Sequence, residues 1–141
     1  MFAPSREQAR RFLFDLWRRY RAGQPLAGLE QTALGVILLH PEYHPILEAP
    51  GRYLERDYSP EAGEPNPFLH LSLHLAVAEQ LSIDQPAGIR GEYQRIRQAL
   101  GSEHDALHAL LECLGETLWQ AQRIGGAPDE RVYLDCLQRR G

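Results

Sequence analysis

The feature that most constrains the fold is a helix that is apolar on every side. Asn66 and Pro67 form a strong helix start, with asparagine at the N-cap and proline at the first helical position. The segment that follows, about residues 67–82, carries apolar residues around almost its whole circumference: Phe68, Leu69, Leu71, Leu73, Leu75, Ala76, Val77 and Ala78. Because a helix that is hydrophobic all round is buried on all sides, we expect it to be the central helix of the fold.

The rest of the chain is predicted to supply the helices around it. Hydrophobic periodicity and capping residues predict helices at about residues 5–21, 26–39, 86–100, 103–123 and 128–139, and a short helix at 40–48. Residues 49–66 are rich in proline, glycine and charged residues and are predicted to form a long loop. Loops of this length often serve as a lid or as a packed arm. No alternating β pattern of useful length occurs. The 141 residues are therefore predicted to form one all-α domain, residues 1–141, a bundle of five to seven helices.

The charge of the chain limits its partners. A net charge of −4 and a pI near 5.8 argue against a general nucleic-acid binder and against binding to anionic membranes. Residues 6–21 differ from the rest, because six arginines against Glu7 and Asp15 give this segment a net charge of +4. A basic first helix can dock a partner, but an exposed face of a surface helix is the simpler interpretation.

Cysteine content and hydropathy set the expected compartment. The two cysteines, Cys113 and Cys136, lack a C-x-x-C spacing, so we expect no disulfide framework and a reducing cytoplasm. No signal peptide is visible, and no segment approaches the roughly 18–20 apolar residues of a membrane span. We expect a soluble cytoplasmic protein.

The histidines carry the strongest functional signal. All six belong to pairs spaced four residues apart: His40 and His44, His70 and His74, and His104 and His108. Residues four apart on a helix lie one turn apart on the same face, so two such imidazoles can converge on one ion at about 2.0–2.1 Å. The pattern predicts a transition-metal site inside a helical protein.

Glutamates extend two of the three pairs. The first and third pairs share the form H-x-x-x-H-x-[IL]-L-E, which places Glu48 after His44 and Glu112 after His108. Each glutamate is predicted to be a third ligand or an acceptor that orients a ligand. The middle pair lacks such a glutamate, because Ala78 occupies the matching position.

The three histidine pairs are not equally strong candidates for metal ligands. His70 and His74 lie in the all-apolar helix, where a neutral metal-bound imidazole resolves the cost of burial. With His104, His108 and Glu112 they are predicted to form the nucleus of the site. His40, His44 and Glu48 form a conditional third arm, since the prolines after both histidines disfavour a helix at each position. The alternative is that these are core histidines satisfied by hydrogen bonds.

Imidazole and carboxylate ligands suit iron, zinc, copper, nickel or manganese. The number of candidate ligands favours a dinuclear iron or zinc centre, with a mononuclear site as the second choice. Three kinds of function remain open: a metal-dependent oxidoreductase or hydrolase acting on a small molecule, a metal or gas sensor, and an interaction module with a purely structural metal. The sequence does not set the oligomeric state.

Several stretches resemble a known family along nearly the whole chain. They are residues 4–10, Leu39–His44, Asn66–His74, Glu79–Pro86 and the run from His104 to Gln122. In these stretches the chain resembles the bacterial domain-of-unknown-function family 1841, which carries no established activity. A looser resemblance connects the histidine pattern with the helical bundles of hemerythrin and DinB type.

Overall fold

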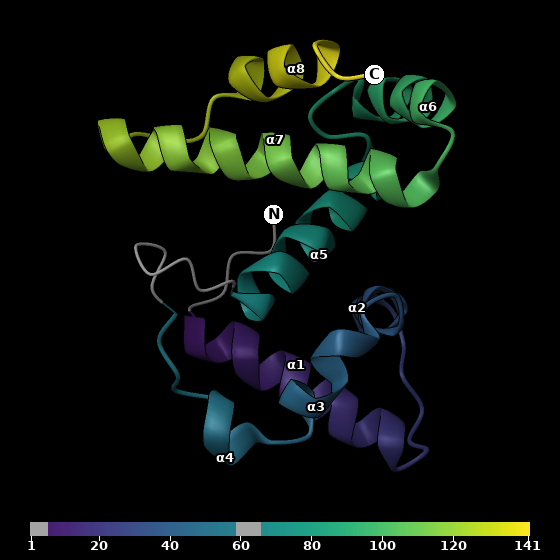
Figure 1. Cartoon of the computed structure of the whole chain (residues 1–141), viewed down its shortest axis with the longest axis vertical. Helices are drawn as coiled ribbons and strands as arrows, with labels where there is room; N and C mark the ends of the chain where they lie inside the picture. Colours follow the sequence, from purple (N-terminus) through teal and green to yellow (C-terminus); the bar gives the residue numbers. More distant parts are fainter. Residues whose placement is uncertain (1–5, 59–65) are drawn as a thin grey trace. The chain divides into compact units, whose positions relative to one another are not determined.

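Every regular element among residues 6–58 and 66–141, which the computed structural model describes, is a helix (Figure 1). The all-α fold class is therefore confirmed. In chain order the elements are α1 (Arg6–Arg21), α2 (Leu29–Leu38), the 3₁₀ helix η1 (Pro41–Tyr43), α3 (His44–Leu47), α4 (Pro50–Tyr53), α5 (Pro67–Ile83), α6 (Ile89–Leu100), α7 (Glu103–Ile124) and α8 (Glu130–Gln138).

Two details differ from the sequence-based expectation. The short helix predicted at residues 40–48 is two elements, η1 and α3, and the single turn α4 lies within the stretch predicted to be a long loop. Proline occupies the first turn of all three elements, where its missing N–H has no helical partner to lose. Residues 59–65 of the predicted loop lie outside the described residues, as does the predicted helix start at Ser5.

The helices form two compact units. The N-terminal unit extends to Leu75 and the C-terminal unit begins at Ala76. Helix α5 starts in the first unit and ends in the second. The expectation of one domain over residues 1–141 stays a prediction.

The core of the N-terminal unit is built on one stripe of α1. Leu13, Phe14, Leu16 and Trp17 are buried there, because positions three and four apart lie on the same face. They pack in one cluster with buried residues of α2, α3 and the first half of α5: Ala33, Ile37, Leu47, Phe68, Leu71 and Leu75. At the start of α5, the side chain of Asn66 accepts hydrogen bonds from two backbone N–H groups, as the sequence predicted. Leu69 and, at the other end of this helix, Ile83 are exposed, at 55% and 58%.

A buried arginine fixes α1 against the chain that leaves α4. Arg10 is 2% exposed, and its guanidinium donates to the backbone carbonyls of Tyr53, Leu54 and Arg56. The same group lies over the ring of Phe68 at 4.5 Å. A buried charge is tolerated where acceptors surround it, so Arg10 joins three segments of the N-terminal unit.

The C-terminal unit packs α6 and α8 against α7. The side chain of Ser102 accepts a hydrogen bond from the backbone N–H of Asp105, which is the cap that the sequence predicted for α7. Gly101 and Gly125 end α6 and α7 in the left-handed conformation, where glycine has no Cβ to clash. Between α5 and α8, the buried hydroxyl of Tyr133 donates to the side-chain oxygen of Gln80 at 2.7 Å.

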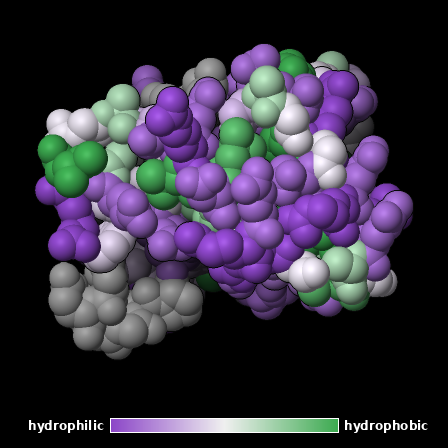
Figure 2. All heavy atoms as spheres, turned by 90° about the horizontal axis from the view of Figure 1, so that it is seen from above, coloured by the Kyte–Doolittle hydropathy of each residue, from purple (hydrophilic) through white to green (hydrophobic). Residues whose placement is uncertain are grey.

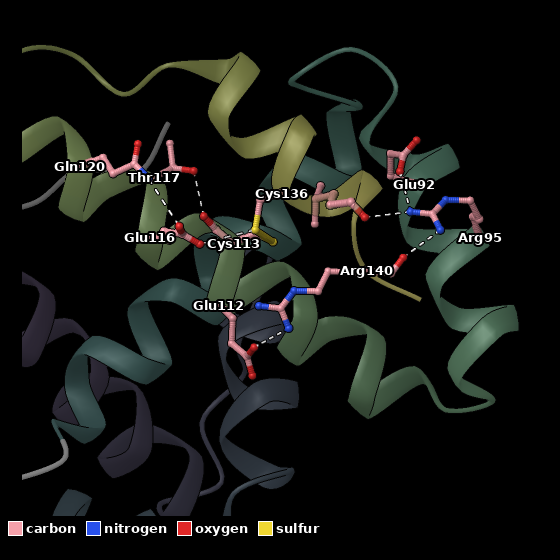
Figure 3. The surroundings of a disulfide bond; sticks show 10 residues. Glu92, Arg95, Glu112, Cys113, Glu116, Thr117, Gln120, Cys136 and Arg140 are labelled. Atoms are coloured by element: carbon pink, nitrogen blue, oxygen red, sulfur yellow. Dashed lines mark hydrogen bonds and ion pairs between the residues drawn. A yellow bond between two sulfur atoms is a disulfide. The ribbon is translucent and has the colours of Figure 1, made fainter.

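A disulfide joins α7 to α8, so the expectation of no disulfide framework is wrong. Cys113 and Cys136 are bonded, with their Cα atoms 5.7 Å apart, and both are buried (Figure 3). The packing of α8 on α7 brings them together across 23 residues of sequence. Sequence spacing alone does not predict that the two cysteines come together, because their distance depends on the angle and register of two helices.

Polar side chains dominate the face shown in Figure 2, and apolar residues lie there in small groups. Among the described residues, no helix combines the length and the apolar character that crossing a bilayer requires.

Candidate metal centre

Three histidines of the N-terminal unit gather at one place. His70 and His74 lie one turn apart on α5, and their ring centroids are 4.9 Å apart, as the spacing predicted. His40 joins them from the turn before η1, with its ring centroid 4.8 Å from that of His70 and 5.0 Å from that of His74. Backbone angles of φ −127° and ψ 68° keep His40 out of any helix, in agreement with the effect expected of Pro41.

The distances between the ring nitrogens suit a metal ion. Each of the three histidines offers one nitrogen, and these atoms lie within 4.8 Å of one another. The Nε2 atoms of His40 and His74 are 3.1 Å apart. Two nitrogens bound to one tetrahedral ion at about 2.05 Å are separated by about 3.3 Å, so this pair already has nearly the required spacing.

Glu42 orients His40 toward the cluster. The Nδ1–H of His40 donates to Oε1 of Glu42 at 2.7 Å. This hydrogen bond is the main reason that the pKa of Glu42 is lowered, against the opposing effect of desolvation. Because Nδ1 carries the proton, Nε2 of neutral His40 keeps its lone pair for the cluster. A carboxylate in this position fixes the ring of a metal-binding histidine and strengthens it as a ligand.

The histidine cluster is largely buried. His40 is 4% exposed and His74 is 2% exposed. Tyr43 stacks on His40 with ring centroids 5.3 Å apart, and burial is the main cause that raises the pKa of the Tyr43 phenol. Burial thus disfavours the phenolate of Tyr43, and a metal ion would require the imidazole lone pairs of the histidines.

The structure does not bring His44 and Glu48 to this cluster. The Nε2–H of His44 donates to the backbone carbonyl of Ile37 at 2.9 Å, and its ring packs on Trp17 with centroids 4.4 Å apart. The Glu48 side chain is 51% exposed and lies 3.9 Å from the guanidinium of Arg21. Glu42, which sequence reasoning missed, has the orienting role predicted for Glu48. A signal was present in the sequence, because Pro41 starts a tight turn that returns Glu42 toward His40.

The remaining predicted ligands belong to the C-terminal unit. His104 and His108 lie one turn apart on α7, and their ring centroids are 4.1 Å apart. Glu112, one turn further along, accepts a hydrogen bond from Arg140 at 2.7 Å and is 61% exposed (Figure 3). Metal binding by these three residues stays a prediction.

Comparison with known proteins assigns the chain to a family. A family model for a domain of unknown function, DUF1841, matches residues 5–139. The chain belongs to the DUF1841 family. No curated protein and no solved structure matches it significantly. DUF1841 membership confirms the resemblance seen in the sequence and brings no activity with it, and the likeness to hemerythrin and DinB bundles stays a prediction.

Proposed function

We propose that this DUF1841 protein binds a first-row transition-metal ion through His40, His70 and His74. The observation that carries the proposal is the convergence of three imidazoles, from a turn and from a helix, with ligand atoms within 4.8 Å of one another. Glu42 supports it, since a carboxylate holds His40 with its Nε2 toward the other two rings.

The ligand set indicates which metals are suitable. Neutral imidazoles bind zinc, iron, copper and nickel, and the two cysteines, joined in a disulfide, offer no thiolate for copper(I). We favour zinc or iron. The carboxylates that a dinuclear centre would use, those of Glu48 and Glu112, pair instead with Arg21 and Arg140. This favours one ion at the His40 cluster. Catalysis at that ion stays a prediction of the sequence.

Metal content and stability together test the proposal. Untagged protein is loaded with zinc or iron(II) and then dialysed. Elemental analysis is expected to find about one metal ion per chain for the cluster of His40, His70 and His74. At a free metal concentration 100 times the dissociation constant, binding stabilises the folded state by about 2.7 kcal/mol. The melting temperature should rise with metal and fall on chelation. His70→Ala and His74→Ala should abolish the part of both effects that comes from the ion at His40, His70 and His74.

Matched variants separate a ligand from a structural histidine. Glu48→Gln keeps size and changes a carboxylate outside the cluster, so it should leave metal content unchanged. Glu42→Gln removes the acceptor of His40 and should weaken binding by roughly 10- to 100-fold. If the histidine variants lower stability to the same extent in metal-free protein, and wild-type protein takes up no metal, the cluster is only a hydrogen-bonded core.

The His104 and His108 pair is proposed as metal-binding from its spacing. His108→Ala should lower metal content, whereas Glu112→Gln should have little effect because Glu112 is exposed and paired with Arg140. Unchanged metal content in His108→Ala would remove this pair from the proposal and leave the His40 cluster untouched.

A further inference from the structure

A second feature of the N-terminal unit is a groove along the basic helix α1. The groove has a volume of about 690 Å³ and lies among α1, α3 and α4. Its lining contains no member of the histidine cluster. We propose that this groove binds an amphiphilic carboxylate, meaning a small molecule with an anionic head and an apolar body.

The floor of the groove suits an apolar body. Phe14 and Trp17 from α1 and Leu47 from α3 line it, and all three are buried members of the core. Leu54 and Pro50 add apolar surface on the side of α4. Small-molecule sites combine such walls with a few polar groups, and their volumes are typically about 300–1,000 Å³. A volume of about 690 Å³ lies in this range.

The polar edge of the groove suits an anionic head. Arg11, Arg18 and Arg21 line it, against the carboxylates of Asp15 and Glu48. Arg18 and Arg21 are 66% and 64% exposed, and Arg21 approaches Glu48 only to 3.9 Å. Exposed ion pairs of this kind contribute about 0–1 kcal/mol, so a ligand carboxylate can compete for these guanidinium groups. Arginine also binds carboxylates through two parallel hydrogen bonds.

Trp17 provides an independent indication of a ligand. It lines the groove and is 3% exposed, and its indole N–H is buried without an acceptor among the residues that the structure describes. A buried donor without an acceptor costs about 1–3 kcal/mol. An oxygen-bearing ligand that reaches this N–H would supply the acceptor. The buried polar atom of the groove that lacks a partner among the described residues is a donor, which favours an anion over an amine.

Chemical-shift titration of the full chain tests this proposal. The indole N–H signals of Trp17 and Trp119 report on the groove and on a site in the other unit, and Trp119→Phe assigns them. Dodecanoate is expected to shift the Trp17 signal in a saturable way and to leave the Trp119 signal in place. Dodecyltrimethylammonium, with the same chain and the opposite charge, should not shift the Trp17 signal.

Variants identify the arginines that bind the head group. Arg18→Gln with Arg21→Gln should weaken dodecanoate binding by about tenfold or more, as expected for the loss of a hydrogen bond to a charged group. The control pair Arg131→Gln with Arg139→Gln, exposed in the C-terminal unit, should bind as the wild type does. Both double variants change exposed side chains, and circular dichroism checks that each variant is folded.

Three results would overturn the proposal. They are the absence of a saturable Trp17 shift at millimolar dodecanoate, equal binding of the cationic amphiphile, and a shift caused by hexaglutamate but not by dodecanoate. The last result would indicate an acidic peptide as the occupant. Because the titration is carried out without metal, failure of the metal proposal does not affect its outcome.

Discussion

Reduction of the disulfide between Cys113 and Cys136 should destabilise the C-terminal unit by about 3 kcal/mol. The bond closes a loop with a sequence separation of 23. Closing such a loop lowers the conformational entropy of the unfolded chain, and the loop-length relation gives about 3 kcal/mol for this separation at 25 °C. The folded helices are expected to keep their other contacts, because reduction adds only two hydrogen atoms and moves the two buried sulfurs apart to van der Waals contact.

Thermal unfolding measures this effect. For a unit of this size, 1 kcal/mol corresponds to a shift of about 4–8 °C, so reduction should lower its melting temperature by roughly 12–24 °C. Circular dichroism at 222 nm, with and without a phosphine reductant, follows the transition. Reduction should be slow in the native state, because Cys113 and Cys136 are 0% and 3% exposed and become accessible when α8 opens.

The control is the variant Cys113→Ala with Cys136→Ala, whose melting should not respond to reductant. Thiol titration of denatured protein should detect no thiol before reduction and two afterwards. The reasoning is refuted if two thiols are found in protein purified without reductant, or if wild-type melting is the same in both conditions.

Further predictions concern single contacts. Tyr133→Phe should cost about 1–3 kcal/mol, since it leaves the buried side-chain oxygen of Gln80 without its donor. Burial raises the pKa of Tyr133, so wild-type stability should fall as the pH rises above about 10, the range in which an unfolded tyrosine ionises, and the Phe variant should lose less over that range. Arg10→Met removes donors from three backbone carbonyls and should cost about 1.5–3 kcal/mol by urea unfolding. Ser102→Ala should cost about 1 kcal/mol, and Ser102→Asp should retain the cap, as judged by the same unfolding assay.

Local sequence rules predicted the long helices well. The start of α5 at Asn66 and Pro67, the Ser102 cap of α7 and its end at Gly125 each depend on residues within one turn of one another. Such signals need no knowledge of the tertiary fold. For the same reason the pairing of His70 with His74 was predictable, because the helix itself places them together.

The candidate metal ligands whose position depends on a turn were harder to predict. Pro41 indicates that His40 leaves the helical path, but the backbone angles of His40 determine where its ring points. Repetition of the H-x-x-x-H-x-[IL]-L-E form drew attention to Glu48, whereas the structure gives the contact with His40 to Glu42. The form repeats in the sequence, but only the segment after His104 is a continuous helix.

The disulfide was missed for a related reason. Cys113 and Cys136 are far apart in sequence, and their approach depends on how α8 lies on α7. Neither residue has a spacing typical of a redox motif. The reducing cytoplasm that was inferred from the cysteines therefore had no structural support.

The different supports of His40 and of the α5 pair have a kinetic consequence. His70 and His74 are held by a helix, whereas His40 is held by a single turn and by its hydrogen bond to Glu42. His40 already lies 3.1 Å from His74, so all three rings would be in place for an ion. His40 would be the ligand most easily lost, because opening a turn breaks fewer contacts than unwinding a helix. A substitution that stiffens or loosens residues 39–43 should thus change the lifetime of the bound ion more than its rate of capture.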